Sequence, residues 1–191
     1  LVRGAVGRLI RAFWVGLARG RQFTGDAGGA AAAMVEARSL AGGLSLREES
    51  HIHAMGLLID GKGPEAYAAI RAHVDQYPRD ALVAQTCSSV FGLIGFSGQP
   101  GREAETLAYV AGLLPHYGED WWVISQYAFA LCESGNLAKA DALIDRSLAM
   151  NPANANGAHV RSHVSYELGD TAGGLSYLAG WVDVADPGAV L

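Results

Sequence analysis

Hydrophobic residues recur every three or four positions along much of this chain, which is the spacing that places them on one face of an α-helix. The segment 121–133 carries Ile124, Ala128 and Leu131 at this spacing, and the segment 137–150 carries Ile144 and Leu148. The pattern therefore predicts one helix over 121–133 and a second over 137–150.

A helix-ending signal returns at nearly constant intervals along the chain. Five glycines begin short polar segments between apolar stretches, and successive members lie 36, 37, 37 and 34 residues apart: Gly25, Gly61, Gly98, Gly135 and Gly169. A glycine in the left-handed conformation commonly ends one helix and turns the chain into an antiparallel neighbour. The intervals therefore predict a series of helical hairpins.

Two of the predicted hairpins match at five positions. Each has a small residue in its first helix, a turn glycine, a small and then a bulky residue in its second helix, and a closing proline. These are Ala128, Gly135, Ala140, Ile144 and Pro152 in 121–154, and Ala54, Gly61, Ala66, Ile70 and Pro78 in 47–80. The pattern resembles the tetratricopeptide repeat, a helix-turn-helix unit of about 34 residues.

The fold expected from these repeats is all-α. It is a right-handed α-α superhelix, a tetratricopeptide-repeat-like solenoid of about five helical hairpins. The hairpins are expected at about 4–42, 46–78, 81–115, 119–152 and 154–185, in a single domain over 1–191 that could belong to a longer solenoid.

Two local features complete the expected fold. Pro78, Pro115 and Pro152 are expected to end the second helices of their hairpins. The uncharged run 81–101 is interpreted as a buried helix, because its glutamine, serine and threonine residues make it a poor membrane span.

A closer resemblance covers roughly residues 45–185. The segments that carry it are Arg47 and Glu48, "PRDAL" at 78–82, "YAFAL" at 127–131, and His159, His163 and Val164. They resemble the tetratricopeptide repeat protein 38 family. The resemblance implies a cytosolic helical-repeat protein, about twice as long as this chain, whose family has no well-defined biochemical role.

Charge and cysteine content narrow the expected partners. The chain has 14 Lys and Arg against 19 Asp and Glu, a net charge of −5, and no block of like charge. We therefore expect neither a nucleic-acid nor a membrane partner. Cys87 and Cys132 lie in apolar stretches without CxxC spacing, which favours two buried thiols in a reducing compartment. The N-terminus has no signal-peptide pattern. The expected location is cytoplasmic, as the family resemblance implies.

Candidate contact residues follow from the repeat resemblance. In tetratricopeptide repeats, positions 2, 5, 9 and 12 of each first helix face a concave groove. Transferred to this sequence, that rule implies a partner-binding set of Arg19, Glu48, His51, Gln85, Ser88, Trp122, Ser125, Phe129, Asn156, His159, His163 and Tyr166. Glu48 has a second interpretation, as a first-turn acid that follows Ser45 at a helix N-cap.

His159 and His163 raise the question of chemistry, because residues four apart share one face of a helix. A zinc site needs three or four convergent ligands, and the pair supplies only two. The zinc-protease motif places Glu after its first His, whereas Val160 follows His159 here. We therefore expect no metal and no cofactor, and name His159 and His163 only as weak metal candidates.

The expected function is a scaffold whose groove binds a protein or peptide segment. The alternative is a small-ligand-binding protein or metal-dependent enzyme that uses His159 and His163 as ligands or bases. A third possibility is that the array is part of a longer solenoid without a site of its own, which exposed apolar residues near Leu178, Trp181 and Val182 would favour. The sequence leaves the oligomeric state open.

Overall fold

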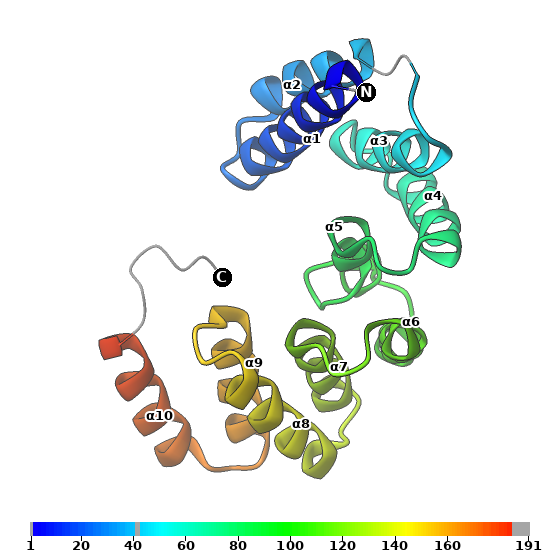
Figure 1. The fold of residues 1–191 in the computed structure, drawn as a ribbon. Helices are drawn as coiled ribbons and strands as arrows, with labels where there is room; N and C mark the ends of the chain where they lie inside the picture. Colours follow the sequence, from blue (N-terminus) through cyan, green and yellow to red (C-terminus); the bar gives the residue numbers. More distant parts are fainter. Residues whose placement is uncertain (1, 41–42, 185–191) are drawn as a thin grey trace. The chain divides into compact units, whose positions relative to one another are not determined.

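The computed structural model describes residues 2–40 and 43–184. Those residues form ten α-helices and two short 3-10 helices, and no β-strand (Figure 1). The all-α prediction is therefore confirmed. The chain divides into two compact units, Leu1–Ala84 (unit 1) and Gln85–Leu191 (unit 2). The expected single continuous domain stays a prediction.

Unit 1 consists of two long antiparallel helix pairs and one short helix. Its elements are α1 (Val2–Phe23), α2 (Ala27–Ser39), α3 (Leu46–Ile59), α4 (Gly63–Gln76) and α5 (Ala81–Ala84). Helix α1 packs on α2, and α3 packs on α4 (Figure 1). Met34, Met55 and Ile70 are fully buried, so long apolar side chains fill the interior of these pairs.

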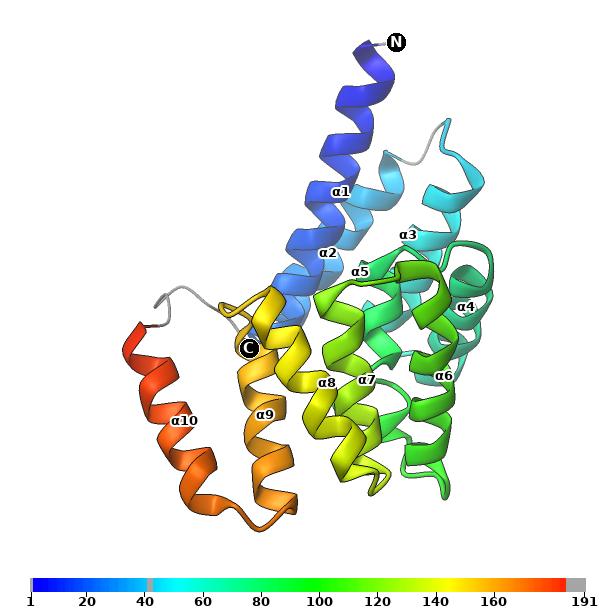
Figure 2. The ribbon, with the colours of Figure 1, turned by 60° about the horizontal axis from the view of Figure 1, so that its bottom comes forward.

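Unit 2 contains the more regular hairpins. Its elements are η1 (Gln85–Cys87), η2 (Gly95–Ser97), α6 (Arg102–Tyr117), α7 (Trp121–Glu133), α8 (Leu137–Met150), α9 (Ala155–Glu167) and α10 (Thr171–Val184). Helices α7, α8 and α9 pack against one another, and α10 packs on α9 (Figure 2). The expected ends of the first and last hairpins, at 42 and 185, lie outside the described residues.

The glycine period corresponds to real turns. Each of the five repeat glycines has a positive φ, from 67° at Gly98 to 79° at Gly25. L-residues with a Cβ adopt this left-handed region only with strain, which is why glycine stands there. Gly25, Gly61, Gly135 and Gly169 each connect two antiparallel helices, as predicted.

The core of unit 2 lies where α7, α8 and α9 meet. Ala128 and Ala140, the small residues of the two repeat helices, are completely buried there. Phe129, Ile144 and Val160 fill the space around them. The 3.6-residue period therefore identified the buried faces of α7 and α8 correctly.

The expectation for 81–101 is wrong. Only Ala81–Ala84 are α-helical, and the rest of the run forms two 3-10 turns and bends. A Cβ on Gly92 would lie 2.7 Å from the carbonyl oxygen of Thr86, and a Cβ on Gly95 would overlap the Val90 carbonyl. The chain thus folds back on itself at contacts that only glycine allows, and this packing replaces the helix.

The expectation for Pro115 is also wrong. Helix α6 continues past Pro115 to Tyr117. Only two helical residues follow Pro115, so the missing backbone donor and the bend imposed by the ring affect only the last turn of α6. Pro78 and Pro152 do follow the ends of α4 and α8, as predicted.

Two further predictions can be compared with the structure. Cys87 and Cys132 are both buried, as expected. Within the described part of the chain, no helix is both long and apolar enough to cross a bilayer.

Candidate functional site

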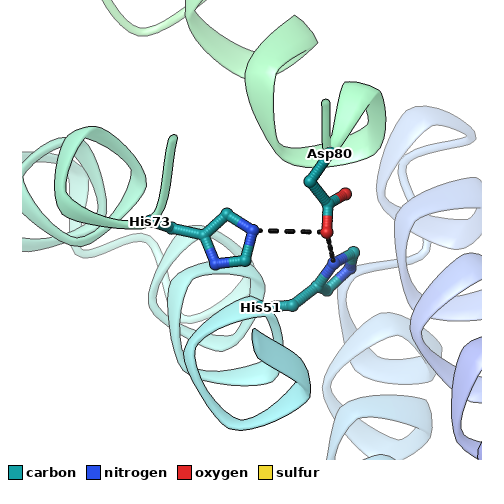
Figure 3. Close-up of side chains that lie close together, drawn as sticks. All are labelled: His51, His73 and Asp80. Atoms are coloured by element: carbon teal, nitrogen blue, oxygen red, sulfur yellow. Dashed lines mark hydrogen bonds and ion pairs between the residues drawn. The ribbon is translucent and has the colours of Figure 1, made fainter. Parts of the chain in front are cut away.

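In unit 1, two imidazoles converge on one buried carboxylate. His51 comes from α3, His73 from α4, and Asp80 from the turn that leads into α5 (Figure 3). The Nδ1 atom of His51 lies 3.1 Å from Oδ2 of Asp80, and Nε2 of His73 lies 3.2 Å from the same oxygen. Asp80 is 5% exposed and His73 is 1% exposed. We call these three residues the His-Asp cluster.

Local sequence explains how the three side chains meet. His73 lies on the buried stripe of α4, three residues after Ile70 and seven after Ala66. Pro78 follows the end of α4, and the turn then brings Asp80 back toward α3 and α4. A buried imidazole on an apolar stripe needs a polar partner, and Asp80 supplies it.

Arg47 adds a positive charge to the same oxygen. Its Nε and Nη2 donate to Asp80 Oδ2 over 3.2 and 3.0 Å, while its own side chain is largely exposed. Burial alone raises the pKa of Asp80, but hydrogen bonds from His51 and His73 and the charges of His51 and Arg47 outweigh it. The net effect holds the pKa of Asp80 well below its usual range, so this carboxylate stays ionised at neutral pH.

Ser50 fixes the far side of the His73 ring. Its Oγ lies 2.7 Å from His73 Nδ1 and also donates to the backbone carbonyl of Arg47 over 3.1 Å. The ring of Tyr77 packs on His73 with centroids 5.1 Å apart. The orientation of His73 is therefore set from two sides.

The cluster has the donor set of a metal site. Among the residues that the structure describes, His51, His73 and Asp80 form a group of three potential ligands whose atoms all lie within 4.8 Å of one another. The repeat pattern predicts a partner-binding position for His51 and gives no role to His73 or Asp80. Two signals in the sequence could have indicated the cluster. His73 lies on an apolar helical stripe, and Asp80 directly follows the Pro-Arg that ends this helix.

Unit 2 holds a second group of rings, which includes the predicted histidine pair. His159 and His163 lie on one face of α9 with their Nε2 atoms 2.9 Å apart. Phe129 of α7 lies against both imidazoles, with ring centroids 6.1 and 5.3 Å away. Phe91 lies nearly parallel to His159 at 6.3 Å, and Phe96 lies 5.8 Å from Phe91. We call these five residues the aromatic cluster.

The two histidines form a hydrogen-bonded pair in which burial affects the titration of His159. Burial, and then the charge of His163, lower the pKa of His159. One proton between the two Nε2 atoms forms this hydrogen bond, so one ring donates and the other accepts. Within residues 2–40 and 43–184, neither histidine belongs to a group of three convergent ligands.

A chain of amide and hydroxyl groups lies on the same side of unit 2. Ser88 donates to Gln126 over 3.0 Å, and the amide nitrogen of Gln126 donates to Asn156 over 3.0 Å. Gln126, which is not among the predicted contact residues, therefore connects two that are, Ser88 and Asn156. Gln126 stands inside the mainly apolar stretch "WWVISQYAFALC". A glutamine buried with such a stretch needs hydrogen-bond partners, which is the signal that could have identified it.

The remaining predicted contact residues have varied environments. Glu48 forms a capping box with Ser45 at the start of α3, which confirms its second interpretation. Ser125 and Phe129 are buried, so they shape the interior beneath the surface rather than present themselves on it. Arg19 bonds Gln22 and lies 4.9 Å from the Phe23 ring.

Three further predicted residues lie in unit 2. Gln85 is exposed, and its backbone oxygen accepts a hydrogen bond from the backbone N–H of Ser88. Trp122 is half-buried against Tyr117, with ring centroids 5.3 Å apart. Tyr166 is exposed on α9, on the same helical face as Asn156, His159 and His163.

No known family profile matches the sequence. Several solved structures have a similar fold. The chain resembles PilW, described as a widely conserved type IV pilus biogenesis factor, with a TM-score of 0.62 and 18% identity over 93% of this chain and 80% of that one. It also resembles residues 41 to the end of MamA from Desulfovibrio magneticus RS-1, with a TM-score of 0.56 and 8% identity over 92% and 94%.

A third similar structure is a tetratricopeptide repeat protein from Parabacteroides merdae ATCC 43184. Its TM-score is 0.57 and its identity 12%, over 92% of this chain and 66% of that one. At these identities the likeness concerns the fold. The fold is therefore all-α and tetratricopeptide-repeat-like.

Proposed function

We propose that this chain is a helical-repeat interaction module and that a protein or peptide segment binds over the aromatic cluster of unit 2. One observation carries the proposal. Phe91 and Phe96 are 61% and 72% exposed, lie against each other, and continue through Phe91 onto the half-buried imidazole of His159. Neighbouring exposed aromatic rings are typical of the residues that dominate the affinity of protein interfaces.

The surroundings of the cluster suit a mixed apolar and polar ligand. Asn156 and Tyr166 stand at the two ends of the α9 face that carries His159 and His163, so they can supply hydrogen bonds at its edges. Phe129 is buried and packs against the rings of both histidines. Gln126, bonded to Ser88 and Asn156, fixes the polar end of this face.

For six residues of the predicted partner-binding set, a contact with a partner stays a prediction. They are Arg19, Glu48, His51, Gln85, Trp122 and Ser125. The membership in the tetratricopeptide repeat protein 38 family and the cytoplasmic location also stay predictions. The repeat fold supports an interaction role, since such folds present extended surfaces to partners. A catalytic role for His159 and His163 has less support, because the described residues bring no third titratable ligand to the pair.

The proposal is tested by affinity purification from cells of the source organism with quantitative mass spectrometry. The native full-length protein is compared with a Phe91→Ser, Phe96→Ser double variant and with a Phe13→Ser control. Phe13 is as exposed as Phe91, at 61%, but lies on α1 of unit 1. Losing two exposed aromatic anchors should weaken a partner's binding by about 2–4 kcal/mol, enough to deplete it strongly.

We expect a partner that the native protein and the Phe13 control enrich equally and that the double variant loses. Equal enrichment by the double variant contradicts binding over the aromatic cluster. Circular dichroism of each variant shows that a loss of binding is not a loss of folding.

A further inference from the structure

The oxygen Asp80 Oδ2 has more neighbours than it can satisfy. Four nitrogen atoms, two from Arg47 and one each from His51 and His73, lie 3.0 to 3.2 Å from it. A carboxylate has about four lone-pair sites shared between its two oxygens, so one oxygen offers about two. Four protons directed at a single oxygen therefore crowd one another.

The hydrogen bonds of Ser50 indicate which proton can be absent. If its hydroxyl donates to the carbonyl of Arg47, then its oxygen accepts from His73 Nδ1. A neutral His73 with its proton on Nδ1 presents a bare lone pair from Nε2 toward Asp80. A cation between this lone pair and the carboxylate oxygen, which lie 3.2 Å apart, would be attracted by both, whereas without a cation the proton stays on Nε2 and is donated to Asp80.

The spacing of the three ligand atoms suits such a cation. With zinc–nitrogen and zinc–oxygen bonds of about 2.0–2.2 Å and tetrahedral angles, ligand atoms stand roughly 3.3–3.5 Å apart. The two nitrogen-to-oxygen distances are 3.1 and 3.2 Å. The two nitrogens lie within 4.8 Å of each other and need to approach by no more than about 1.5 Å.

We propose that His51, His73 and Asp80 bind a divalent transition-metal ion in unit 1, with the fourth position open to water or a ligand. Two imidazoles and one carboxylate form a donor set of this kind. Ser50 acts as the outer partner that holds His73 with Nε2 toward the metal. The His51 side chain is 17% exposed, so the site reaches solvent on that side. This proposal is independent of the proposed function, whose residues lie in unit 2.

Arg47 competes with the metal for Asp80. Its guanidinium brings a positive charge to the oxygen that would ligate the ion. Because more than half of the Arg47 side chain is exposed, it can turn into solvent when the ion binds. Removal of this charge should therefore strengthen metal binding, whereas a purely hydrogen-bonded role of the cluster predicts no such gain.

The test titrates Zn²⁺ into the full-length protein after chelator treatment, by calorimetry, with Co²⁺ absorption to report tetrahedral coordination. Five proteins are compared: native, His51→Ala, His53→Ala, Arg47→Ala and Ser50→Ala. His53 lies two residues beyond His51 on α3 and is exposed, so it is the matched control. Circular dichroism establishes that each protein is folded.

We expect one Zn²⁺ per native chain, unchanged affinity in His53→Ala, and affinity at least as high in Arg47→Ala. Ser50→Ala should bind about 10–100-fold more weakly, and His51→Ala more weakly still. The proposal is overturned if the native protein binds no stoichiometric Zn²⁺, or if His51→Ala keeps the native affinity. If His51→Ala does not fold, weaker binding by Arg47→Ala than by the native protein overturns it.

Discussion

Replacement of Asp80 by Asn tests how much the His-Asp cluster contributes to the stability of unit 1. The amide keeps the shape of the carboxylate but loses its charge and one acceptor oxygen. The Nε2 atom of His73 then loses its strongest acceptor. Water cannot replace this acceptor, because the His73 side chain has no exposed surface. Leaving a buried polar group poorly satisfied costs about 1–3 kcal/mol. Arg47 adds little, because exposed ion pairs contribute only about 0–1 kcal/mol.

The free energy of unfolding is measured by urea denaturation and far-UV circular dichroism, in buffer that contains a chelator. We expect Asp80→Asn to lose about 1–3 kcal/mol and Arg47→Ala to lose no more than about 1 kcal/mol. A loss below about 0.5 kcal/mol for Asp80→Asn, the range of ordinary surface changes, would refute the stabilising role of the buried carboxylate. An equal loss in Arg47→Ala would show that the exposed charge, not the buried histidine, is the important partner.

Three further predictions concern other residues. Gly135→Ala should lower the free energy of unfolding in urea by about 1–2 kcal/mol, because the φ of Gly135 is +76°. Gly112→Ala, at an exposed position within α6, should raise it by up to about 1 kcal/mol. The opposite ranking refutes the turn assignment. Burial lowers the pKa of His159, so the unfolded chain takes up a proton at this residue before the folded chain does. The free energy of unfolding should therefore fall as the pH drops through about 6.5, and it should fall less in His159→Gln. Identical pH profiles of the two proteins contradict this. Burial raises the pKa of Cys132 to about 11 from 9.0, so alkylation of the folded protein at pH 8 should be about a hundredfold slower than that of an ordinary thiol, and rapid labelling contradicts it.

Much of the fold was predictable because it depends on local signals. The positive-φ glycines recur at a fixed period, and the buried alanines of α7 and α8 follow the helical period. Both signals act within one hairpin, so a single sequence contains them. The run 81–101 was mispredicted because its conformation depends on backbone contacts of Gly92 and Gly95 with residues several positions away. Apolar composition does not reveal such contacts.

In the candidate sites, too, contacts within one helix could be predicted and contacts between separate segments could not. The pairing of His159 with His163 could be predicted, because both residues belong to one helix. The contact of His159 with Phe91 could not, because Phe91 belongs to the misassigned segment. The His-Asp cluster was missed because its members come from α3, α4 and the following turn. Only tertiary packing brings such residues together.

Site-specific photo-crosslinking tests the interaction surface most directly. A photoreactive phenylalanine analogue is placed at Phe91 in the full-length protein, and at Phe13 in a second protein, within cells of the source organism. Both positions are 61% exposed, so the probe is equally accessible at each. We predict a discrete cross-linked partner from position 91 that is lost when Phe96→Ser is added, and none from position 13. A partner that cross-links from position 13 and not from position 91 would contradict the proposed surface.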